Sequence, residues 1–339
     1  MRIVAGGLVM AVCATFSAGC AQVENLLGTS APKAGPSSKP PEPAPALSAA
    51  EAKRVVVTWA RAFNRAAKKY DIKAAEKIET GALLEGHRAE FKIMRINDLL
   101  VPPMRATSDV TIPRFTGWPK WFTATMTSKG ETTVVDQVVF VQLARGGPWQ
   151  AASDTVVDRK VTKALGRGVN APADAEVVPA GDTTLRIAPG RLAAAHAHAA
   201  RYGARSPHTK LFGSASETAG EYAELMKAHR LFKKNGWSGR TTVYGSAHPM
   251  YALRTASGGA VAFYAVDRKA TYKRVKGDMS FSWSGGIGKL YPALLGREYA
   301  EDEFTRVERT EYATYIPPQG KGKVHVLASR WTPVSAEGA

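Results

Sequence analysis

The stretch SAAEAKRVVVTWARAFNRAAKKY, residues 48–70, decides the fold of the first half of the chain. Ser48 and Glu51 have the spacing of a capping box, in which two side chains satisfy free backbone N–H groups where a helix begins. Behind them, apolar residues recur every three or four positions and predict one buried stripe on a long helix: Ala52, Val55, Val56, Trp59, Phe63, Ala66 and Tyr70. Such a helix needs a sheet or other helices to cover its apolar side.

After this helix the pattern changes from helical to alternating. A short helix is expected around 72–78, and a second one within 88–100 ends before Pro102 because the residue preceding a proline avoids the helical region. The segment WFTATMT alternates apolar and polar residues, which predicts a half-buried strand. The expected strands are 121–127, 132–143 and 149–157, the last two joined as a hairpin by ARGGP.

The second half repeats this order of helices followed by strands. Helices are expected at 191–202 and 216–234, each stopped by a glycine or an Asn-Gly pair. Strands are expected at 241–246, 250–255, 259–267, 278–284, 304–316 and 323–331. The predicted fold class is α+β, with two tandem domains at 48–160 and 190–335, a linker at 161–189, and in each domain a curved antiparallel sheet wrapped around a helix.

The first of these domains resembles the NTF2-like, cystatin-type superfamily. The resemblance is carried by VVVTWARAFNRAAKKYD, which is similar to its opening helix, and by VVFVQLARGGPWQAASDTVV, which is similar to its last hairpin. It implies an NTF2-like or cystatin-like α+β fold. It implies no catalytic positions.

The first residues indicate export. Met1 and Arg2 precede an uncharged apolar run that ends at Phe16, as in the core of a signal peptide, here 1–19. Ser17-Ala18-Gly19 before Cys20 resembles the lipobox of bacterial lipoproteins, which implies a diacylglyceryl group on Cys20 and a membrane anchor. Ser17 stands where that family prefers Leu, so cleavage without lipidation is the alternative. Residues 20–47 are rich in proline and predict a disordered tether.

Taken as a whole, the chain is similar to uncharacterised secreted lipoproteins of high-GC Gram-positive bacteria. The signal, the tether and the run YATYIPPQGKGKVHVLASRW carry this similarity. It implies a lipid-anchored protein of the cell membrane that faces the extracytoplasmic side. It does not imply a known activity.

The formal charge of +17 makes anionic surfaces the natural partners of this chain. Anionic lipid or an envelope polymer fits an exported basic protein, together with a protein partner whose identity the sequence does not give. A nucleic-acid partner is not expected because no zinc-finger, basic-zipper or RNP-like motif accompanies the charge.

Motifs for covalent chemistry fail on inspection. His196 and His198 are two apart on a helix and point in different directions, so they do not form a metal site by themselves. SGGIGKL lacks two residues of a phosphate loop, and GWSGR lacks the last glycine of a nucleophile elbow. The prediction is therefore a protein that is not an enzyme and has no cofactor, no metal and no catalytic residue.

Aromatic residues gather on the predicted strands of the second half. Cone-shaped α+β folds leave cavities lined by such residues, so a ligand site is expected at His248, Tyr251, Tyr264 and Trp283. The expected function is a membrane-anchored binding or scaffold module of the cell envelope. The alternatives are a carrier of a small hydrophobic or lipid ligand and, third, an envelope hydrolase.

Overall fold

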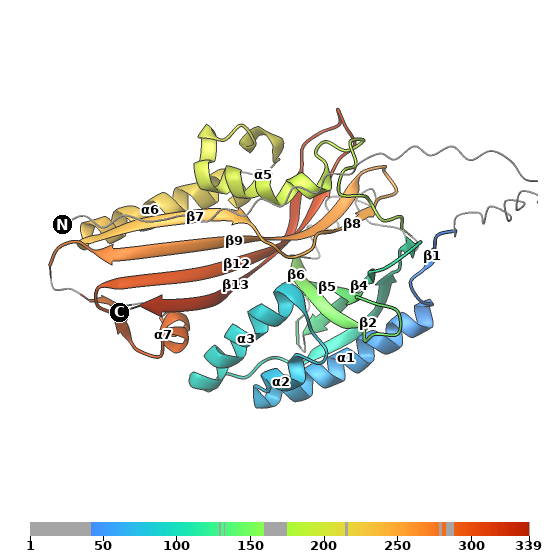
Figure 1. The fold of residues 1–339 in the computed structure, drawn as a ribbon, viewed down its shortest axis with the longest axis horizontal. Helices are drawn as coiled ribbons and strands as arrows, with labels where there is room; N and C mark the ends of the chain where they lie inside the picture. Colours follow the sequence, from blue (N-terminus) through green and yellow to red (C-terminus); the bar gives the residue numbers. More distant parts are fainter. Residues whose placement is uncertain are drawn as a thin grey trace, which may run out of the picture. The chain divides into compact units, whose positions relative to one another are not determined.

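The computed structural model describes residues 42–128, 130–131, 133–158, 175–213, 216–277, 280–282 and 288–338. The predicted signal peptide, Cys20, most of the predicted tether and Trp283 lie outside these residues. From Glu42 onward the chain forms one compact unit by its contacts. Within it, two layers can be distinguished, each made of helices on a sheet (Figure 1).

The first layer contains three helices and a four-stranded antiparallel sheet. The helices are α1 (Ala49–Lys69), α2 (Ile72–Ala75) and α3 (Gly81–Ile96). The strands are β2 (Met104–Thr111), β4 (Lys120–Ser128), β5 (Val134–Gln142) and β6 (Gln150–Asp158), in the order β2-β4-β5-β6. β1 (Ala44–Pro45) pairs with β3 (Arg114–Phe115), so ordered chain begins before Ser48, inside the segment expected to be a tether.

The capping box predicted for α1 is confirmed. The backbone N–H of Glu51 donates to Ser48 Oγ at 3.2 Å, and the Ser48 N–H donates to Glu51 Oε2 at 2.8 Å. Most of the predicted stripe is buried against the sheet, where the Trp59 ring stacks on Phe63 and meets Phe140 edge-on; Val55 and Tyr70 are partly buried. The helix predicted at 88–100 begins earlier, at Gly81.

The prediction that residues 121–127 form a half-buried strand is wrong about burial. The strand exists as part of β4, and its two faces are both buried: Phe122 is 0% exposed on one, Trp121 only 5% on the other. The reason is that the second layer covers the outer face, where Trp121 meets Tyr251 edge-on at 5.3 Å between ring centroids. β2, which pairs with β4, was not predicted from the sequence.

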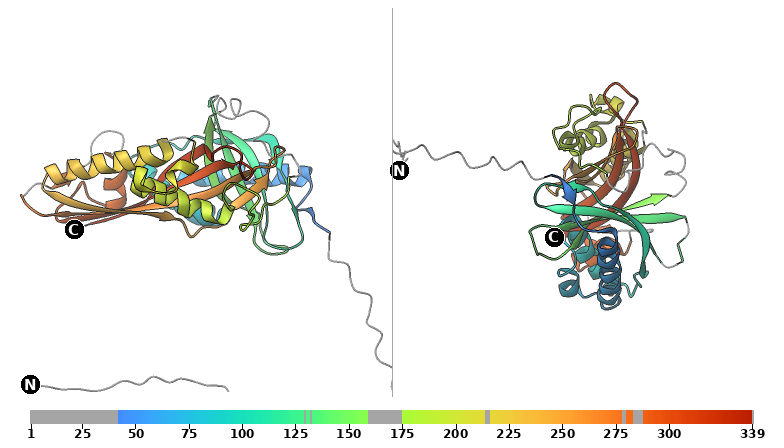
Figure 2. Two further views of the ribbon diagram at one scale, coloured as in Figure 1. Left: turned by 90° about the horizontal axis from the view of Figure 1, so that it is seen from above. Right: turned by 90° about the vertical axis from the view of Figure 1, so that its right-hand side faces the viewer.

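The second layer contains a five-stranded antiparallel sheet. Its helices are α5 (Pro189–Tyr202), α6 (Glu221–Lys234), which follows a π-helical turn at Ser216–Gly220, and α7 (Leu290–Leu295); 3-10 turns lie at Gly203–Arg205 and Thr209–Leu211. The strands are β7 (Trp237–Gly245), β8 (Tyr251–Arg254), β9 (Ala260–Arg274), β12 (Glu303–Ile316) and β13 (His325–Gly338). Their order is β13-β12-β9-β7, with β8 also on β9, and α6 runs along this sheet (Figure 2).

Two features of the second layer differ from expectation. Of the strand predicted at 278–284, the described part is β10 (Phe281–Ser282), which pairs with β11 (Tyr299–Ala300); Asp278, Met279 and Trp283 lie outside the described residues. The helix α7 was not predicted because it is short and lies among glycines and prolines. The helices expected at 191–202 and 216–234 correspond to α5 and α6.

The layers meet through β13, which contacts β6 and α3. Arg330 on β13 bonds to Asp154 on β6 and to Glu90 on α3. The α+β class is confirmed, whereas the tandem NTF2-like or cystatin-like domains and their boundaries stay predictions. Among the described residues, no helix has the length and apolar character required to cross a bilayer.

Candidate functional site

A pocket of about 290 Å³ lies where α1, α3 and the four-stranded sheet meet β13. We call it the α3 pocket. Its walls are largely apolar: Trp59, Phe63, Ile93, Met94, Val101, Pro102, Met104, Leu290, Trp331 and Pro333. Its polar side chains are His87, Glu90, Ser128, Asp136, Asp154 and Arg330. Apolar walls with a few polar groups are typical of small-molecule sites.

Helix α3 brings a histidine and a carboxylate to this pocket. His87 and Glu90 are three residues apart, so they lie on the same helix face. His87 Nδ1 bonds to Glu79 Oε2 at 2.8 Å, and its Nε2 lies 3.7 Å from Glu90 Oε2. Burial alone would lower the pKa of His87, but the Glu79 and Glu90 carboxylates outweigh burial and raise it above its ordinary value. His87 therefore lies between two carboxylates that favour its protonated form.

The sheet brings two more carboxyl groups. Asp136 on β5 pairs with Val156, and Asp154 on β6 pairs with Val138, so the two acids are diagonal neighbours on the same face of the sheet. Asp154 is 3% exposed and Asp136 is 7% exposed. This is the helix-facing side of the sheet, which otherwise carries apolar residues such as Val138 and Phe140.

Strand β13 supplies the cation that faces these acids. Arg330 Nη1 donates to Asp154 Oδ2, and its Nη2 donates to both carboxylate oxygens of Glu90, at 3.1 and 3.0 Å. On β12, Glu311 lies directly opposite Arg330 in the strand register and accepts from the Asp154 backbone N–H at 3.4 Å. Five carboxyl groups thus surround Arg330 and His87, namely those of Glu79, Glu90, Asp136, Asp154 and Glu311.

The acids of the pocket divide by their pKa values. Burial opposes ionisation of Glu90, but Arg330 and His87 outweigh it and hold its pKa below the ordinary value. Burial, and after it the Asp154 carboxylate, raise the pKa of Asp136 to about 7. Burial raises the pKa of Asp154 as well, and it raises that of Glu311 to about 7. Near neutral pH the cluster therefore holds protons that exposed carboxylates would have lost.

Two buried polar atoms of residues lining this pocket lack a hydrogen-bond partner within the described part of the chain. They are Nε1 of Trp59, a donor, and Oδ1 of Asp154, an acceptor. The side chains of both residues are almost fully buried. Buried polar atoms in folded proteins are nearly always paired, so each such exception requires an explanation.

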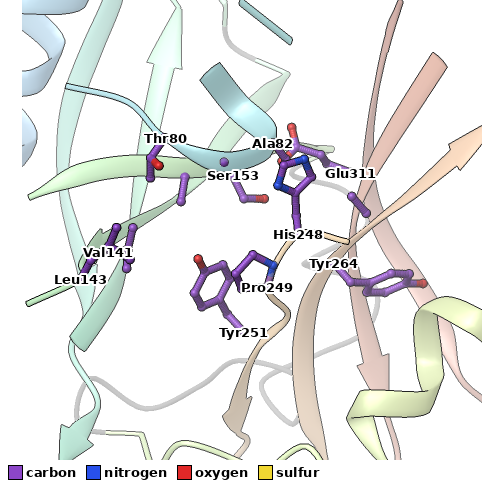
Figure 3. Close-up of a pocket in the computed structure, with 13 residues that line it drawn as sticks. Thr80, Ala82, Val141, Leu143, Ser153, His248, Pro249, Tyr251, Tyr264 and Glu311 are labelled. Atoms are coloured by element: carbon purple, nitrogen blue, oxygen red, sulfur yellow. The ribbon is translucent and has the colours of Figure 1, made fainter. Parts of the chain in front are cut away.

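The residues predicted from the sequence line a different pocket. His248 and Tyr251 contribute to a cavity of about 80 Å³ between the layers, together with Thr80, Ser153 and Glu311 (Figure 3). His248 Nε2 lies 3.3 Å from Glu85 Oε2, which also accepts from Arg309. Burial raises the pKa of Tyr251 to about 12. Trp283 lies outside the described residues.

Tyr264 lines the same small cavity but points away from His248, toward α5 (Figure 3). Its hydroxyl lies 2.7 Å from His196 Nδ1 and 3.1 Å from Thr314 Oγ1. His196 Nε2 donates to the Glu217 carbonyl at 2.6 Å, so Nδ1 accepts from the tyrosine. Burial lowers the pKa of His196 to about 4. His198 bonds elsewhere, to Ser206 at 2.8 Å.

The acids of the α3 pocket were missed by sequence reasoning, although a signal for them exists. Asp136 shares its strand face with Val138 and Phe140, and a carboxylate in that register is unusual for a core-facing position. His87 and Glu90 occur at helical spacing in HRAEF. Arg330 carries no comparable signal, because nothing local indicates that β13 faces α3.

The chain belongs to the family described as a domain of unknown function, DUF8094, which matches residues 43–338. It is similar to an uncharacterised lipoprotein of Streptomyces coelicolor, with 30% identity over 157 residues. That match covers 44% of this chain and 46% of the relative, so the chain spans about half the length of the curated relative it matches. No solved structure matches.

Proposed function

We propose that the protein is a lipid-anchored, extracytoplasmic binding protein that holds a small ligand in the α3 pocket and does not change it covalently. The anchor rests on the lipobox-like Ser17-Ala18-Gly19-Cys20 and on similarity to a Streptomyces lipoprotein. Acylation of Cys20 with two or more chains would hold the protein stably on the membrane. Among the functions expected from the sequence, the carrier is the one that this pocket favours.

The observation that carries the proposal is the pair of unpartnered buried atoms, Trp59 Nε1 and Asp154 Oδ1. Leaving a buried donor or acceptor without a partner costs about 1–3 kcal/mol. A bound molecule with one acceptor and one donor would satisfy both atoms. Its remaining surface would contact the apolar walls, which include Met94, Val101 and Leu290.

The described lining residues favour binding over covalent catalysis. The Ser128 hydroxyl donates to Met104 Sδ at 3.4 Å instead of to a base. Nucleophilic catalysis requires a nucleophile within hydrogen-bond reach of its base. The cysteines of the sequence are Cys13 and Cys20, both near the N-terminus.

The test is native mass spectrometry of the full chain purified from its own membrane. Met94→Trp places a large side chain in the pocket, whereas Leu231→Trp makes a comparable change at a position 60% exposed on α6. We expect a retained small molecule on the native protein and on Leu231→Trp, and its loss from Met94→Trp. Equal retention by both variants, or an unliganded native protein, would contradict the proposal.

The same preparation tests the anchor. Cys20→Ser should lose the mass of the acyl groups and leave the membrane fraction. Membrane association at unchanged mass would show that Cys20 is not the attachment point.

An envelope hydrolase is the second candidate, and the pair of Asp136 and Glu90 favours it. A carboxyl group with raised pKa near one with lowered pKa is the arrangement used for general acid and base roles. A catalyst would return the retained molecule altered after incubation in excess, whereas a carrier would return it intact.

A further inference from the structure

We infer that the α3 pocket is selective for a small organic cation over neutral and anionic molecules of the same shape: an amine whose otherwise apolar body carries an acceptor for Trp59 Nε1. This inference rests on the proposed ligand-binding function and names the chemical class of the ligand. It is carried by the charge balance of the pocket, by the acceptor atoms left open there, and by the character of the walls.

The cluster around the pocket contains more acidic than basic side chains, although the chain as a whole is basic. The whole chain has a formal charge of +17, but in this cluster five carboxyl groups face the two basic groups, Arg330 and His87. Arg330 is engaged with Glu90 and Asp154, and His87 with Glu79 and Glu90. Within the described residues, Asp136 and Glu311 form no ion pair, and of these two only Asp136 lines the α3 pocket.

The open acceptors lie where one ammonium group can reach them. Asp136 and Asp154 are diagonal neighbours on one face of the sheet, and Asp154 Oδ1 has no donor among the described residues. An ammonium group has three N–H donors and a full positive charge, so it can bond to both carboxyl groups and compensate their charge. A hydroxyl group offers one donor and no charge. An anion would meet only repulsion from these acids.

The walls favour an organic cation over a metal ion. Among the described residues, no three His, Cys, Asp or Glu side chains are grouped so that they could hold a metal. The remaining lining is apolar or aromatic, with Trp331 contributing a ring surface on β13. Aromatic faces attract ammonium groups, and apolar walls bind the carbon body of the ligand.

Binding of a cation should release a proton. Because Asp136 keeps its proton up to about pH 7, a protonated amine that binds there below this pH must displace it. In that exchange the carboxyl O–H bond breaks, the proton passes to solvent, and the carboxylate pairs with the ammonium. The charged groups that face Asp136 are Asp154, Arg330 and Glu131, and those that face Asp154 are Arg330, His87, Glu90 and Glu311. Affinity should therefore rise with pH between about 5 and 7.

The experiment uses the full chain and four probes: benzylamine, benzyl alcohol, n-hexylamine and 1-hexanol. Both amines stay protonated between pH 5.5 and 8, and Trp59 and Trp331 line the pocket, so tryptophan fluorescence and probe line broadening in NMR report binding. We expect each amine to bind at least tenfold more tightly than its alcohol at pH 8. Amine affinity should fall by up to about tenfold for each pH unit below 7.

Asp136→Asn is the decisive variant because it keeps the shape of the side chain and removes its charge. It should reduce amine affinity at least tenfold at pH 8 and make that affinity nearly independent of pH. Glu224→Gln, at an exposed position on α6, is the matched control. It should change neither the amine affinity at pH 8 nor the pH dependence of that affinity. A cooperative thermal melt of Asp136→Asn confirms that the variant is folded.

Two outcomes overturn the inference while the carrier function stands. One is alcohol binding as tight as amine binding, and the other is unchanged amine affinity in Asp136→Asn. Failure of both amines to bind overturns it as well. The carrier function itself fails on separate evidence, namely equal retention of the native ligand by Met94→Trp and Leu231→Trp.

Discussion

Two clusters of buried polar groups, one around Tyr264 and one around the α3 pocket, lie beside the same kinds of helix and sheet, but their hydrogen bonds are satisfied differently. In the second layer, Tyr264 donates to His196, His196 donates to the Glu217 carbonyl, and the neighbouring Tyr312 donates to Glu221 at 2.7 Å. In the first layer, Trp59 Nε1, Asp154 Oδ1 and Glu79 Oε1 lack partners within the described chain. The cluster around Tyr264 closes its hydrogen bonds internally, whereas the residues around the α3 pocket leave several atoms open. Open atoms also occur elsewhere in the second layer, at Ser246, Tyr272 and Arg306.

This difference separates a structural polar cluster from a binding site. The cluster around Tyr264 packs ring against ring, with Tyr264 and Tyr312 stacked at 5.5 Å and His196 at 4.4 Å from Tyr312. The cluster around Arg330 borders a pocket of about 290 Å³. Burial and titratable groups occur in both layers, so only the open atoms beside free volume indicate a place for a ligand.

The largest effect is expected from removing Arg330, the cation that strand β13 of the second layer contributes to the α3 pocket. Arg330→Ala leaves Asp154 and Glu90 without their partner, which should lower the free energy of unfolding by about 3 kcal/mol. This is the low end for a buried ion pair because the Arg330 side chain keeps 21% exposure. Urea unfolding measures the loss. Arg65→Ala, on the exposed side of α1, should lower the free energy of unfolding by less than about 0.5 kcal/mol. An equal loss in both variants would contradict the role of Arg330 as the partner of the buried acids.

The second prediction compares free volume in the two layers. Ala199→Leu enlarges a fully buried side chain in the core of the second layer, and overpacking there should cost about 2 kcal/mol. Met94→Phe enlarges a residue that lines the α3 pocket, so it should cost less than about 1 kcal/mol. Thermal melts of the two variants measure this difference. Similar losses in both would mean that the first layer is as tightly filled as the second.

The third prediction concerns the closed hydrogen bonds of the second layer. Tyr264→Phe leaves Nδ1 of His196 buried without its donor, which should destabilise the protein by about 1–2 kcal/mol. Ligand retention should not change, because the Tyr264 hydroxyl bonds within the second layer and Tyr264 is not a lining residue of the α3 pocket. Tyr244→Phe, at a half-exposed tyrosine on β7, serves as the control in urea unfolding. Loss of the ligand in Tyr264→Phe would show that ligand binding in the α3 pocket depends on the hydrogen bonds of Tyr264.

The smallest expected effect is a difference in the sign of pH dependence. Asp136 has a pKa of about 7 in the folded chain against an ordinary 3.8, so between these values only the folded state holds its proton, and stability falls as pH rises. His196 has a pKa of about 4 against an ordinary 6.5, so between those values only the unfolded state is protonated, and stability falls as pH falls.

Two variants measure these opposite slopes. From pH 6 to pH 7, Asp136→Asn should gain stability relative to the native chain and His196→Phe should lose it, each by about 1 kcal/mol. Because every variant is compared with itself at two pH values, a constant cost of the substitution cancels. Shifts of the same sign in both variants would contradict a raised pKa at Asp136 together with a lowered pKa at His196.

The sequence predicts those elements whose signals are local. The capping box of Ser48 and Glu51, the stripe of α1 and the hairpin of β5 and β6 are each written within a few residues of one another, and all are present. The sequence did not predict that β4 is buried on both faces, because Trp121 is covered by Tyr251, which is more than a hundred residues away. Burial on the outer face depends on long-range packing that no local pattern encodes.

The same limit applies to the site. His248 and Tyr251 do line a cavity, but its volume is about 80 Å³, and the larger pocket joins α3 to β13. Glu90 and Arg330 are separated by 240 positions, and only the strand order places them in contact. An unusual carboxylate in a core-facing register, such as Asp136, is the signal that would have pointed to this place.

The position of strand β13 late in the sequence means that the α3 pocket is completed late in synthesis. The strand follows every other element that lines the α3 pocket and contributes Arg330, Trp331 and Pro333 to it. During synthesis, α1 and its sheet can assemble long before this strand emerges, but the acids on β5 and β6 then have no arginine beside them. A chain that ends before β13 lacks three lining residues of the pocket, so ligand occupancy would distinguish finished molecules from truncated ones.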